Sequence, residues 1–177
     1  MTVRVGFLRA VNLGKRRVAM SRLVAVGEAL GHTDVWTHIN SGNVVFDGTG
    51  SRAKVEKAFE DALEKEFGFE CTTFVRTAAE VRALLDATPF AVAPGDTHFV
   101  TFLKRAPGAG QKKALEALSG DFDTLVLEGA DVHWRMHGKS SDSPLTRRDW
   151  EKVLGPLSST SRNMTMLRGL SAKIAKR

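Results

Sequence analysis

The order of apolar and polar positions in the first half of the chain predicts alternating strands and helices. Val3 to Leu8 is short, apolar and rich in β-branched residues, as buried strands are. Apolar residues then recur at helical spacing from Met20 to Leu30, and again after Ser51, a helix-capping residue, as far as Phe67. Two apolar runs between these helices flank Asn40-Ser41-Gly42-Asn43, which predicts a β-hairpin. Thr72 to Val75 supplies a fourth strand.

The second half repeats this order of elements. A strand from His98 to Leu103 is followed by a helix from about Gln111 to Leu118 and by strands Thr124 to Leu127 and Val132 to Met136. Its opening segment, VTFLKRAPG, is similar to VGFLRAVNLG near the N-terminus, which indicates an internal duplication. The predicted fold class is therefore α+β, with two ferredoxin-like β-α-β-β-α type subdomains and mainly antiparallel sheets, followed by a C-terminal helix.

The predicted domain boundaries follow from this pattern. We expect a first α/β subdomain over residues 1–77, a helical connector over 78–95, and a second α/β subdomain with the C-terminal helix over 96–177. Thr77 and Glu80 have the spacing of a capping box and begin the connector helix. We expect these parts to form one compact family domain overall.

Turn and capping residues outline the end of the chain. Ser143, as a cap, and Pro144, at the first helical position, predict the start of a helix that Gly155-Pro156 ends. Thr160 to Asn163 then precedes the final helix, which is expected to begin near Asn163.

Positive charge is concentrated at both ends of the chain. The net charge is +6, and residues 1–22 hold six Lys and Arg with no Asp or Glu. Residues 23–134 hold ten basic against seventeen acidic residues, and residues 135–177 hold ten against three. If the ends meet in space, they form a basic surface that attracts phosphates or other anions; the alternative is two unconnected solvated faces.

Composition indicates an ordinary globular domain, with 42% hydrophobic and 26% charged residues. No segment reaches the roughly 20 apolar residues of a membrane span, and the N-terminus lacks the apolar run of about 7–15 residues of a signal peptide. The single cysteine, Cys71, cannot form an internal disulfide, as is usual in reducing compartments. We therefore expect a cytoplasmic protein that does not associate with membranes.

Three motifs, GFLRAVNLGKRRVAM, DVWTHINSGNVVF and TSRNMTMLRGL, together resemble the family known as domain of unknown function 1697. The family pattern has FLRGINVGG after the first strand, then a Met-x-x-Leu helix, TYIQSGNVVF and, late in the chain, TTRNWNT. This chain departs from it at Ala10, Lys15, His38 and Met164, where the family has Gly, Gly, Tyr and Trp. The resemblance implies two α/β subdomains and no established activity. It points to these residues as ligand-binding: Arg9, Asn12, Ser41, Gly42, Asn43, Arg162 and Asn163.

The residues after the first strand and in the hairpin turn have two interpretations each. Arg9 offers a planar set of donors for phosphate or carboxylate and Asn12 an orienting amide, whereas the alternatives are a structural ion pair and a turn. Ser41, Gly42 and Asn43 could face the same ligand. A tight hairpin needs these residues without any ligand, and this structural interpretation is favoured.

The segment Thr160-Ser161-Arg162-Asn163 could form an anion site at the start of the last helix through its hydroxyls, its guanidinium group and free helix N–H groups. Alternatively, Ser161 or Asn163 caps that helix. Arg162 favours the anion, because capping does not need a guanidinium group.

Other chemistry has little support in the sequence. His133 and His137 on one strand would lie about 13 Å apart, too far for one metal ion, and no Cys, His or carboxylate cluster compensates. Cys71 beside Glu70 is expected to be inert. Neither a phosphate loop nor a dinucleotide-binding glycine motif is present. We therefore expect no metal and no cofactor, and no catalytic residue is assigned.

Three functions remain in view. The leading interpretation is that the protein binds a phosphorylated or other anionic small molecule through a polar basic cleft, and whether it is an enzyme is left open. The second is a nucleic-acid-binding module that contacts phosphates through Lys15, Arg16, Arg17, Arg168, Lys173, Lys176 and Arg177. The third is a non-catalytic structural or protein-interaction domain, and the sequence leaves the oligomeric state open.

Overall fold

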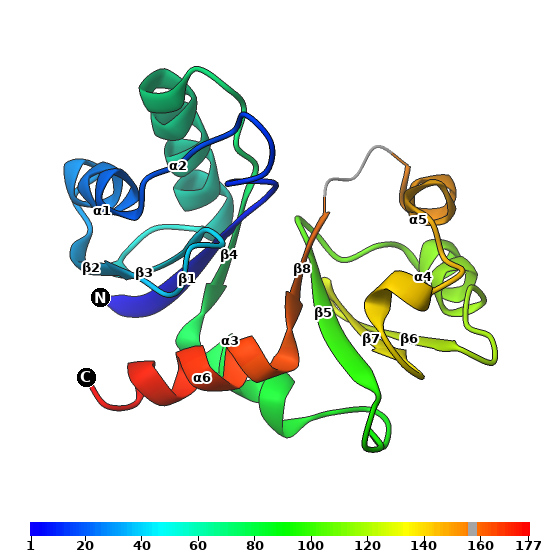
Figure 1. The fold of residues 1–177 in the computed structure, drawn as a ribbon. Helices are drawn as coiled ribbons and strands as arrows, with labels where there is room; N and C mark the ends of the chain where they lie inside the picture. The colour runs from blue at the N-terminus through cyan, green and yellow to red at the C-terminus, as the bar shows by residue number, and fades with distance from the viewer. Residues whose placement is uncertain (156–158) are drawn as a thin grey trace. The chain divides into compact units, whose positions relative to one another are not determined.

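The computed structural model describes residues 1–155 and 159–177 and divides the chain into two compact units. The first unit comprises Met1–Ala83 together with Leu170–Arg177, and the second comprises Leu84–Gly169. The sequence placed the whole C-terminal helix in the second subdomain, whereas its last residues belong to the first unit. Each unit is a four-stranded sheet with helices on one face (Figure 1).

The first unit and the connector contain β1 (Thr2–Leu8), α1 (Met20–Ala29), β2 (Thr33–Thr37), β3 (Asn43–Gly48), α2 (Arg52–Phe67), β4 (Thr73–Thr77) and α3 (Ala78–Asp86). Its strands lie in the order β2-β3-β1-β4, and all neighbouring strands are antiparallel. This is the ferredoxin-like arrangement that the sequence predicts.

The second unit and the C-terminal helix contain β5 (Thr97–Leu103), α4 (Ala109–Glu116), β6 (Asp123–Glu128), β7 (Asp131–Met136), a 3-10 turn (Ser140–Asp142), α5 (Arg147–Leu154), β8 (Ser159–Asn163) and α6 (Met164–Ile174). The strand order is β6-β7-β5-β8, again with every neighbouring pair antiparallel. Each strand thus has a counterpart in the first unit, and the predicted α+β fold with two similar halves is confirmed.

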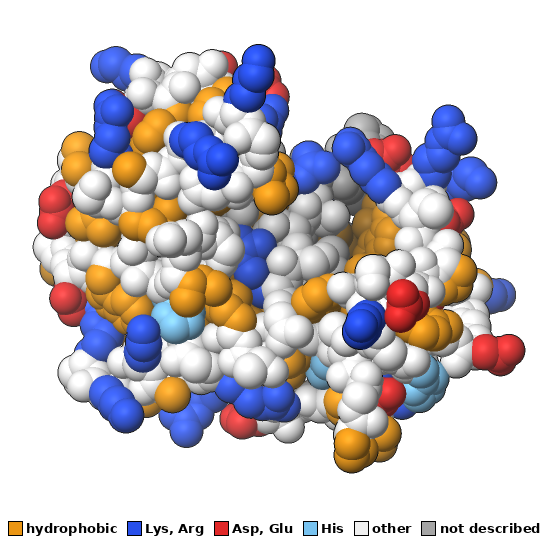
Figure 2. Space-filling model, viewed as in Figure 1, with side chains coloured by type: hydrophobic (Ala, Val, Ile, Leu, Met, Phe, Trp, Pro, Cys, Tyr) orange, Lys and Arg blue, Asp and Glu red, His pale blue; other side chains and the backbone are white. Residues whose placement is uncertain are grey.

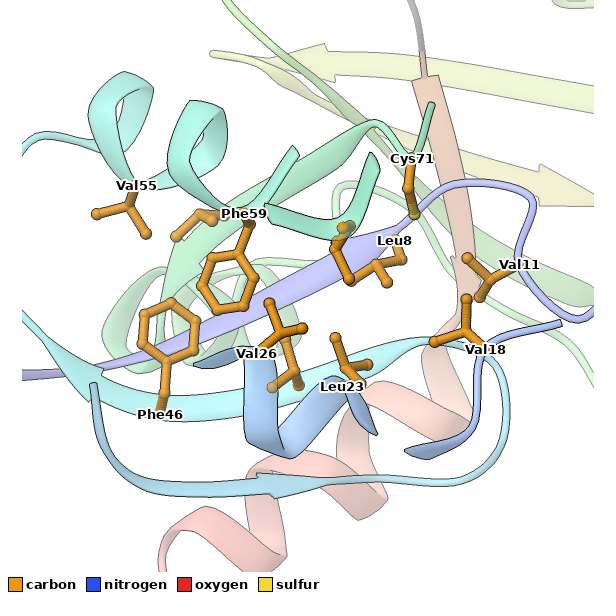
Figure 3. Close-up of a cluster of buried hydrophobic side chains, with 12 residues drawn as sticks. Leu8, Val11, Val18, Leu23, Val26, Phe46, Val55, Phe59 and Cys71 are labelled. Carbon is orange, nitrogen blue, oxygen red and sulfur yellow. The ribbon is translucent and has the colours of Figure 1, made fainter. Parts of the chain in front are cut away.

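The core of the first unit lies between its sheet and helices α1 and α2. Figure 3 shows Leu23 and Val26 of α1 facing Phe59 of α2, with Phe46 of β3 beside them. All four are buried, and full burial of such a side chain stabilises the fold by about 1.5–3 kcal/mol. This packing holds both helices against the sheet and so positions the loop that follows β1.

Two predicted helix caps are present. The Ser51 hydroxyl accepts a hydrogen bond from the Lys54 N–H at 3.4 Å, and Thr77 and Glu80 form a capping box in which the Glu80 N–H donates to the Thr77 hydroxyl at 3.1 Å. The Thr77 N–H in turn donates to the Glu80 carboxylate at 2.8 Å. No helix in the part of the chain that the structure describes is long and apolar enough to cross a membrane.

The segment Thr160–Asn163 is an edge strand, which the sequence did not predict. Within β8, Thr160 lies opposite Phe102 and Asn163 opposite Phe99, antiparallel to β5. The segment has no apolar alternation by which sequence reasoning could identify a strand. Pairing with β5, a non-local interaction, determines its conformation instead.

The predicted start of α5 at Ser143 and Pro144 is also wrong. The helix begins at Arg147, and Thr146 caps it by donating its N–H and hydroxyl to the Asp149 carboxylate at 2.7 and 2.8 Å. The Ser143 hydroxyl donates to the buried Asp123 carboxylate at 2.9 Å, so a tertiary partner holds it. Gly155, at φ +65°, ends the helix as predicted, and Pro156 lies outside the described residues.

Candidate functional site

Asn12 fastens the loop after β1 to the hairpin between β2 and β3. Its Oδ1 accepts the Val18 N–H at 2.9 Å, and its Nδ2 donates to the Asn40 carbonyl at 2.8 Å. Both ends of the amide therefore bind backbone. These contacts are those of a structural turn, and a role for Asn12 in ligand binding stays a prediction.

The buried side chain of Asn43 stabilises the hairpin turn between β2 and β3 through hydrogen bonds. It is fully buried, and its Nδ2 donates to the His38 carbonyl at 2.9 Å and to the Ser41 hydroxyl at 2.8 Å. The His38 N–H donates in return to the Asn43 carbonyl at 3.0 Å. The contacts of Ser41 and Asn43 thus agree with the structural interpretation, while their binding of a ligand is a prediction without a test.

The hairpin turn approaches the end of β1 so closely that position 42 requires a glycine. Its carbonyl accepts the Leu8 N–H at 2.8 Å, and its φ of +73° favours glycine. A Cβ at this position would lie 2.5 Å from Val11 Cγ2 and 2.9 Å from Leu8 Cβ. The hairpin turn and the end of β1 therefore pack as closely as backbone atoms allow.

Arg9 lines a small cavity of about 90 Å³ in the first unit, together with Arg16, Glu70 and Thr72. The Arg9 N–H donates to the Thr72 carbonyl at 2.8 Å, which fixes the backbone but leaves the guanidinium group at the cavity. Arg16 Nη1 donates to the Glu70 carbonyl at 3.4 Å. The cavity is basic but holds little more than a few water molecules, each of which occupies about 30 Å³.

Arg162 lies inside β8 and is only 9% exposed. Its Nη1 donates to the Thr160 hydroxyl at 2.8 Å and to the Ser161 carbonyl at 2.9 Å. Burial lowers the pKa of Arg162 to about 10, so it stays charged near neutral pH. Arg162 is thus a buried strand residue, and α6 begins two residues later, at Met164.

The first unit has a matching arginine that sequence reasoning missed. Arg76 of β4 lies opposite Val5 of β1, as Arg162 of β8 lies opposite Val100 of β5. Arg76 is 1% exposed, and its Nη1 also donates to the carbonyl of the residue before it, at 2.8 Å. Alignment of the two repeated halves strand by strand would have paired these residues.

A cavity of about 330 Å³ in the second unit brings together Asn163 and Arg168, two residues that the sequence singled out for different functions. It lies where α6 begins, and the Asn163 Oδ1 accepts the Thr165 N–H at 2.8 Å, which caps this helix. Arg168, one turn further along, is exposed. Besides these three, the polar lining consists of Asp96, Thr97 and His98.

His98 is the buried polar residue of this cavity, with 5% exposure. Its Nε2 lies 3.1 Å from Nδ1 of the fully buried His133, so one ring donates to the other. Among the described residues, neither His98 Nδ1 nor His133 Nε2 has a hydrogen-bond partner. Burial, helped by the nearby charges of His133, Arg168 and Arg135, lowers the pKa of His98 to about 4. Burial also lowers the pKa of His133, and both rings are neutral near pH 7.

Asp96 contributes the negative charge in the cavity wall. Its carboxylate accepts from His137 Nδ1 at 3.0 Å and from the Ala93 N–H at 2.9 Å. The hydrogen bond from His137, followed by that from Ala93, lowers the pKa of Asp96. His137 therefore pairs with Asp96 rather than with His133. Within residues 1–155 and 159–177, no group of three or more His, Cys, Asp or Glu could hold a metal ion.

The basic residues of the nucleic-acid alternative are divided between the units. Lys15, Arg16 and Arg17 lie exposed on a tight turn of the first unit, and the C-terminal residues from Lys173 onward belong to that unit too, whereas Arg168 belongs to the second. Arg177 forms ion pairs with Asp34 and Asp47. Figure 2 shows Lys and Arg side chains in separate groups over the first unit, on the left.

The comparison with protein families agrees with the first two sequence motifs, GFLRAVNLGKRRVAM and DVWTHINSGNVVF, which lie within the matched residues. A family model described as a protein of unknown function (DUF1697) matches residues 1–133. The chain belongs to the DUF1697 family. The fold is similar to that of the conserved bacterial protein SP0830 from Streptococcus pneumoniae, with a TM-score of 0.73, 20% identity, and coverage of 100% of this chain and 99% of that chain. No curated protein matches the sequence.

Ala10, where the DUF1697 pattern has glycine, adopts a φ of +53°. A side chain in the left-handed region costs about 1–2 kcal/mol, while glycine loses about 0.5–1 kcal/mol of backbone entropy on folding. Ala10→Gly should therefore raise the free energy of unfolding by about 0.5–1 kcal/mol in urea denaturation. Ala53→Gly in the exposed face of α2 is the matched control and should lower it by a similar amount; a loss of stability in Ala10→Gly would contradict the assigned strain.

Gly42→Ala should destabilise this DUF1697 protein through both backbone strain and the clash with Val11. We expect the free energy of unfolding to fall by about 2–4 kcal/mol. Gly129 has a φ of +60°, and a Cβ added there would meet no atom within 4 Å, so this position isolates the strain. Gly129→Ala should therefore cost only about 1–2 kcal/mol. Equal losses in the two variants, measured by urea denaturation, would show that the close approach at the hairpin turn contributes nothing.

His98 should make the stability depend on pH. Its pKa is about 4 in the folded protein against an ordinary value of 6.5, so the unfolded chain binds more protons between these values. Stability should be complete above about pH 6.5 and decline as the pH falls toward about 4. His98→Asn should flatten this decline in urea midpoints measured across that range. Leu115→Ala, which truncates a buried side chain in the core on the other face of the sheet, should lower stability equally at every pH; an unchanged slope in His98→Asn would refute the assignment.

Proposed function

We propose that this DUF1697 protein binds an anionic small molecule, a phosphate ester or a carboxylate, in the cavity of the second unit where α6 begins. The observation that carries the proposal is the combination of Arg168 with the buried, incompletely hydrogen-bonded His98 in one cavity. The proposal is one of binding and assigns no reaction.

The electrostatics of the cavity favour an anion. The N-terminus of a helix carries about half a positive charge, and α6 begins in the cavity wall. Arg168 adds a full charge with several N–H donors, which form strong hydrogen bonds to phosphate or carboxylate. Asp96 opposes this charge, but its carboxylate oxygens already accept hydrogen bonds from His137 and Ala93.

The histidine pair gives the site a donor that adapts to its ligand. A neutral imidazole has one N–H, and whichever ring donates in the His98–His133 contact decides the state of His98 Nδ1. When His133 Nδ1 donates to His98 Nε2, His98 Nδ1 carries the hydrogen. His98 Nδ1 is itself enclosed, and an anion bound in the cavity favours this arrangement because a nearby N–H dipole stabilises negative charge.

The size of the cavity limits the ligand. About 330 Å³ lies at the lower end of the range of about 300–1,000 Å³ for small-molecule sites. A phosphorylated sugar or a small carboxylate fits such a volume, while a dinucleotide does not. The proposal does not require Arg9, Asn12, Ser41, Gly42 or Asn43, which belong to the first unit.

Calorimetric titration with inorganic phosphate and with glucose 6-phosphate tests the site. Arg168→Ala should weaken binding by about tenfold or more, because a hydrogen bond to a charged group contributes about 1.5–3 kcal/mol. Arg148→Ala, an exposed position on α5, removes the same charge away from the cavity and should leave the affinity within about twofold. Equal weakening in both variants, or no saturable binding by the native protein, would refute the anion site.

A nucleic-acid role is the second candidate, supported by one observation. The turn that bears Lys15, Arg16 and Arg17 is held by a bridge between Leu13 and Arg16, so its exposed charges are preorganised. Binding of a short oligonucleotide that weakens steeply with salt, and that a triple Ala variant of this turn abolishes, would favour this function.

A further inference from the structure

Among the described residues, the second unit has a cavity at the place where the first unit has a filled core. In the first sheet Gly6 lies opposite Val75, and in the second sheet Thr101 lies opposite Ser161. Val75 is 1% exposed and belongs to the core beneath the helices. Its counterpart, Ser161, is exposed. At equivalent positions of β4 and β8, on the same face of the sheet, the first unit therefore has the two buried methyl groups of Val75 and the second unit has the hydroxyl of Ser161.

The helix over this position is also shorter. Helix α2 of the first unit has 16 residues and buries Val55, Phe59 and Leu63, whereas α5 of the second unit has 8 residues and buries Leu154. Because an α-helix rises about 1.5 Å per residue, α5 covers about half the length of sheet that α2 covers. The second unit therefore lacks both the apolar side chain and the helix length at the same place, beside α5.

A cavity of about 240 Å³ lies between β8 and α5 as a result. Figure 2 shows a hollow there, on the right, with hydrophobic side chains along its wall. Its floor carries the hydroxyls of Thr101, Ser159 and Ser161. Its walls are the indoles of Trp134 and Trp150. One side of the cavity is thus aromatic and the other bears hydroxyl groups.

The two indoles are held in fixed positions. Their centroids lie 5.3 Å apart with planes at 60°, an edge-to-face contact. Trp134 Nε1 donates to the buried Asp123 carboxylate at 2.6 Å, which anchors that ring from behind. Neither indole is fully buried, so both present surface to the cavity. A flat ring can pack on such a surface without rearrangement of the protein.

The floor is polar but carries no charge. The hydroxyls of Thr101 and Ser161 lie 2.7 Å apart and hydrogen-bond to each other, and every hydroxyl can donate or accept. Arg147, at the edge of the cavity, already pairs with Glu151, its neighbour one helical turn away. The lining therefore requires no charged ligand.

We propose that this cavity binds a planar heteroaromatic ring of the nucleobase class, and that it is a second site, independent of the anion cavity at α6. The face of such a ring stacks on indole, and its edge nitrogens and carbonyls match hydroxyls that donate or accept. A hexose fits less well, because its many hydroxyls would need carboxylate or amide partners that this lining lacks among the described residues.

The three tryptophans make the test specific. Protein labelled with ¹⁵N in its indoles gives one N–H resonance each for Trp36, Trp134 and Trp150, and Trp36 lies in β2 of the first unit. Titration with adenosine, which has no charge, should shift the Trp134 and Trp150 resonances saturably and leave Trp36 in place. Trp36→Phe assigns the reference signal.

A cavity-filling variant separates binding from folding. Thr101→Val combined with Ser161→Val replaces both partners of one hydrogen bond, so no hydroxyl is left without its partner, and it places at position 161 the residue found at Val75. This variant should melt at or above the temperature of the native protein and lose the adenosine shifts. Trp150→Leu should weaken adenosine about tenfold or more, because base stacking is lost.

Three results would overturn the proposal. These are the absence of saturable shifts at millimolar adenosine, shifts that persist in the folded valine double variant, and equal movement of the Trp36 resonance. Glucose shifting the same two resonances more strongly than adenosine would overturn the ligand class. Arg168→Ala should leave the adenosine shifts unchanged, so failure of this site and failure of the anion site are distinguishable.

Discussion

The pairing of one central strand on both of its edges is the interaction on which each unit depends. β1 lies between β3 and β4, and β5 lies between β7 and β8, with every pair antiparallel. Because buried backbone N–H and C=O groups need partners, even the polar segment Ser159–Asn163 pairs as a strand with the edge of β5. Because successive side chains of a strand point to opposite faces, Ser161 faces the helices and Arg162 faces the other side of the sheet. Asn163, the last residue of β8, lies at the start of α6.

The repeat provides an internal comparison that a single unit could not. Both sheets keep the same strand order, and both keep a buried arginine opposite a valine, Arg76 in one and Arg162 in the other. A guanidinium group is costly to bury, so its presence at both positions indicates that the framework requires it there. The helix-covered faces differ instead: the first is filled by apolar side chains of a long helix, and the described residues of the second leave a cavity beside a short one.

Local sequence patterns correctly predicted those structural features that depend on interactions between residues close in the chain. The hairpin around Gly42 and the caps at Ser51 and Thr77 were correct because turn and cap chemistry lies within a few residues. The strand β8 escaped prediction because its partner, β5, is about sixty residues away in the chain. For the candidate site, Asn163 could be identified from its motif, while the contact between His98 and His133 depends on the register of β5 against β7 and is invisible to periodicity.

The distribution of imperfect packing supports the proposal that the second unit binds a ligand. A domain selected for stability alone would fill the space beneath α5, because each buried methylene stabilises the fold by about 0.8 kcal/mol. The first unit shows that this same topology can be filled, since Val75 occupies the position of Ser161. Departures from such consistency are expected where a protein binds something. The cavities at α6 and beneath α5 both belong to the second unit. They combine hydroxyls, an arginine and a buried histidine pair with two indoles that also pack on the core, and such a set of groups suits ligand recognition.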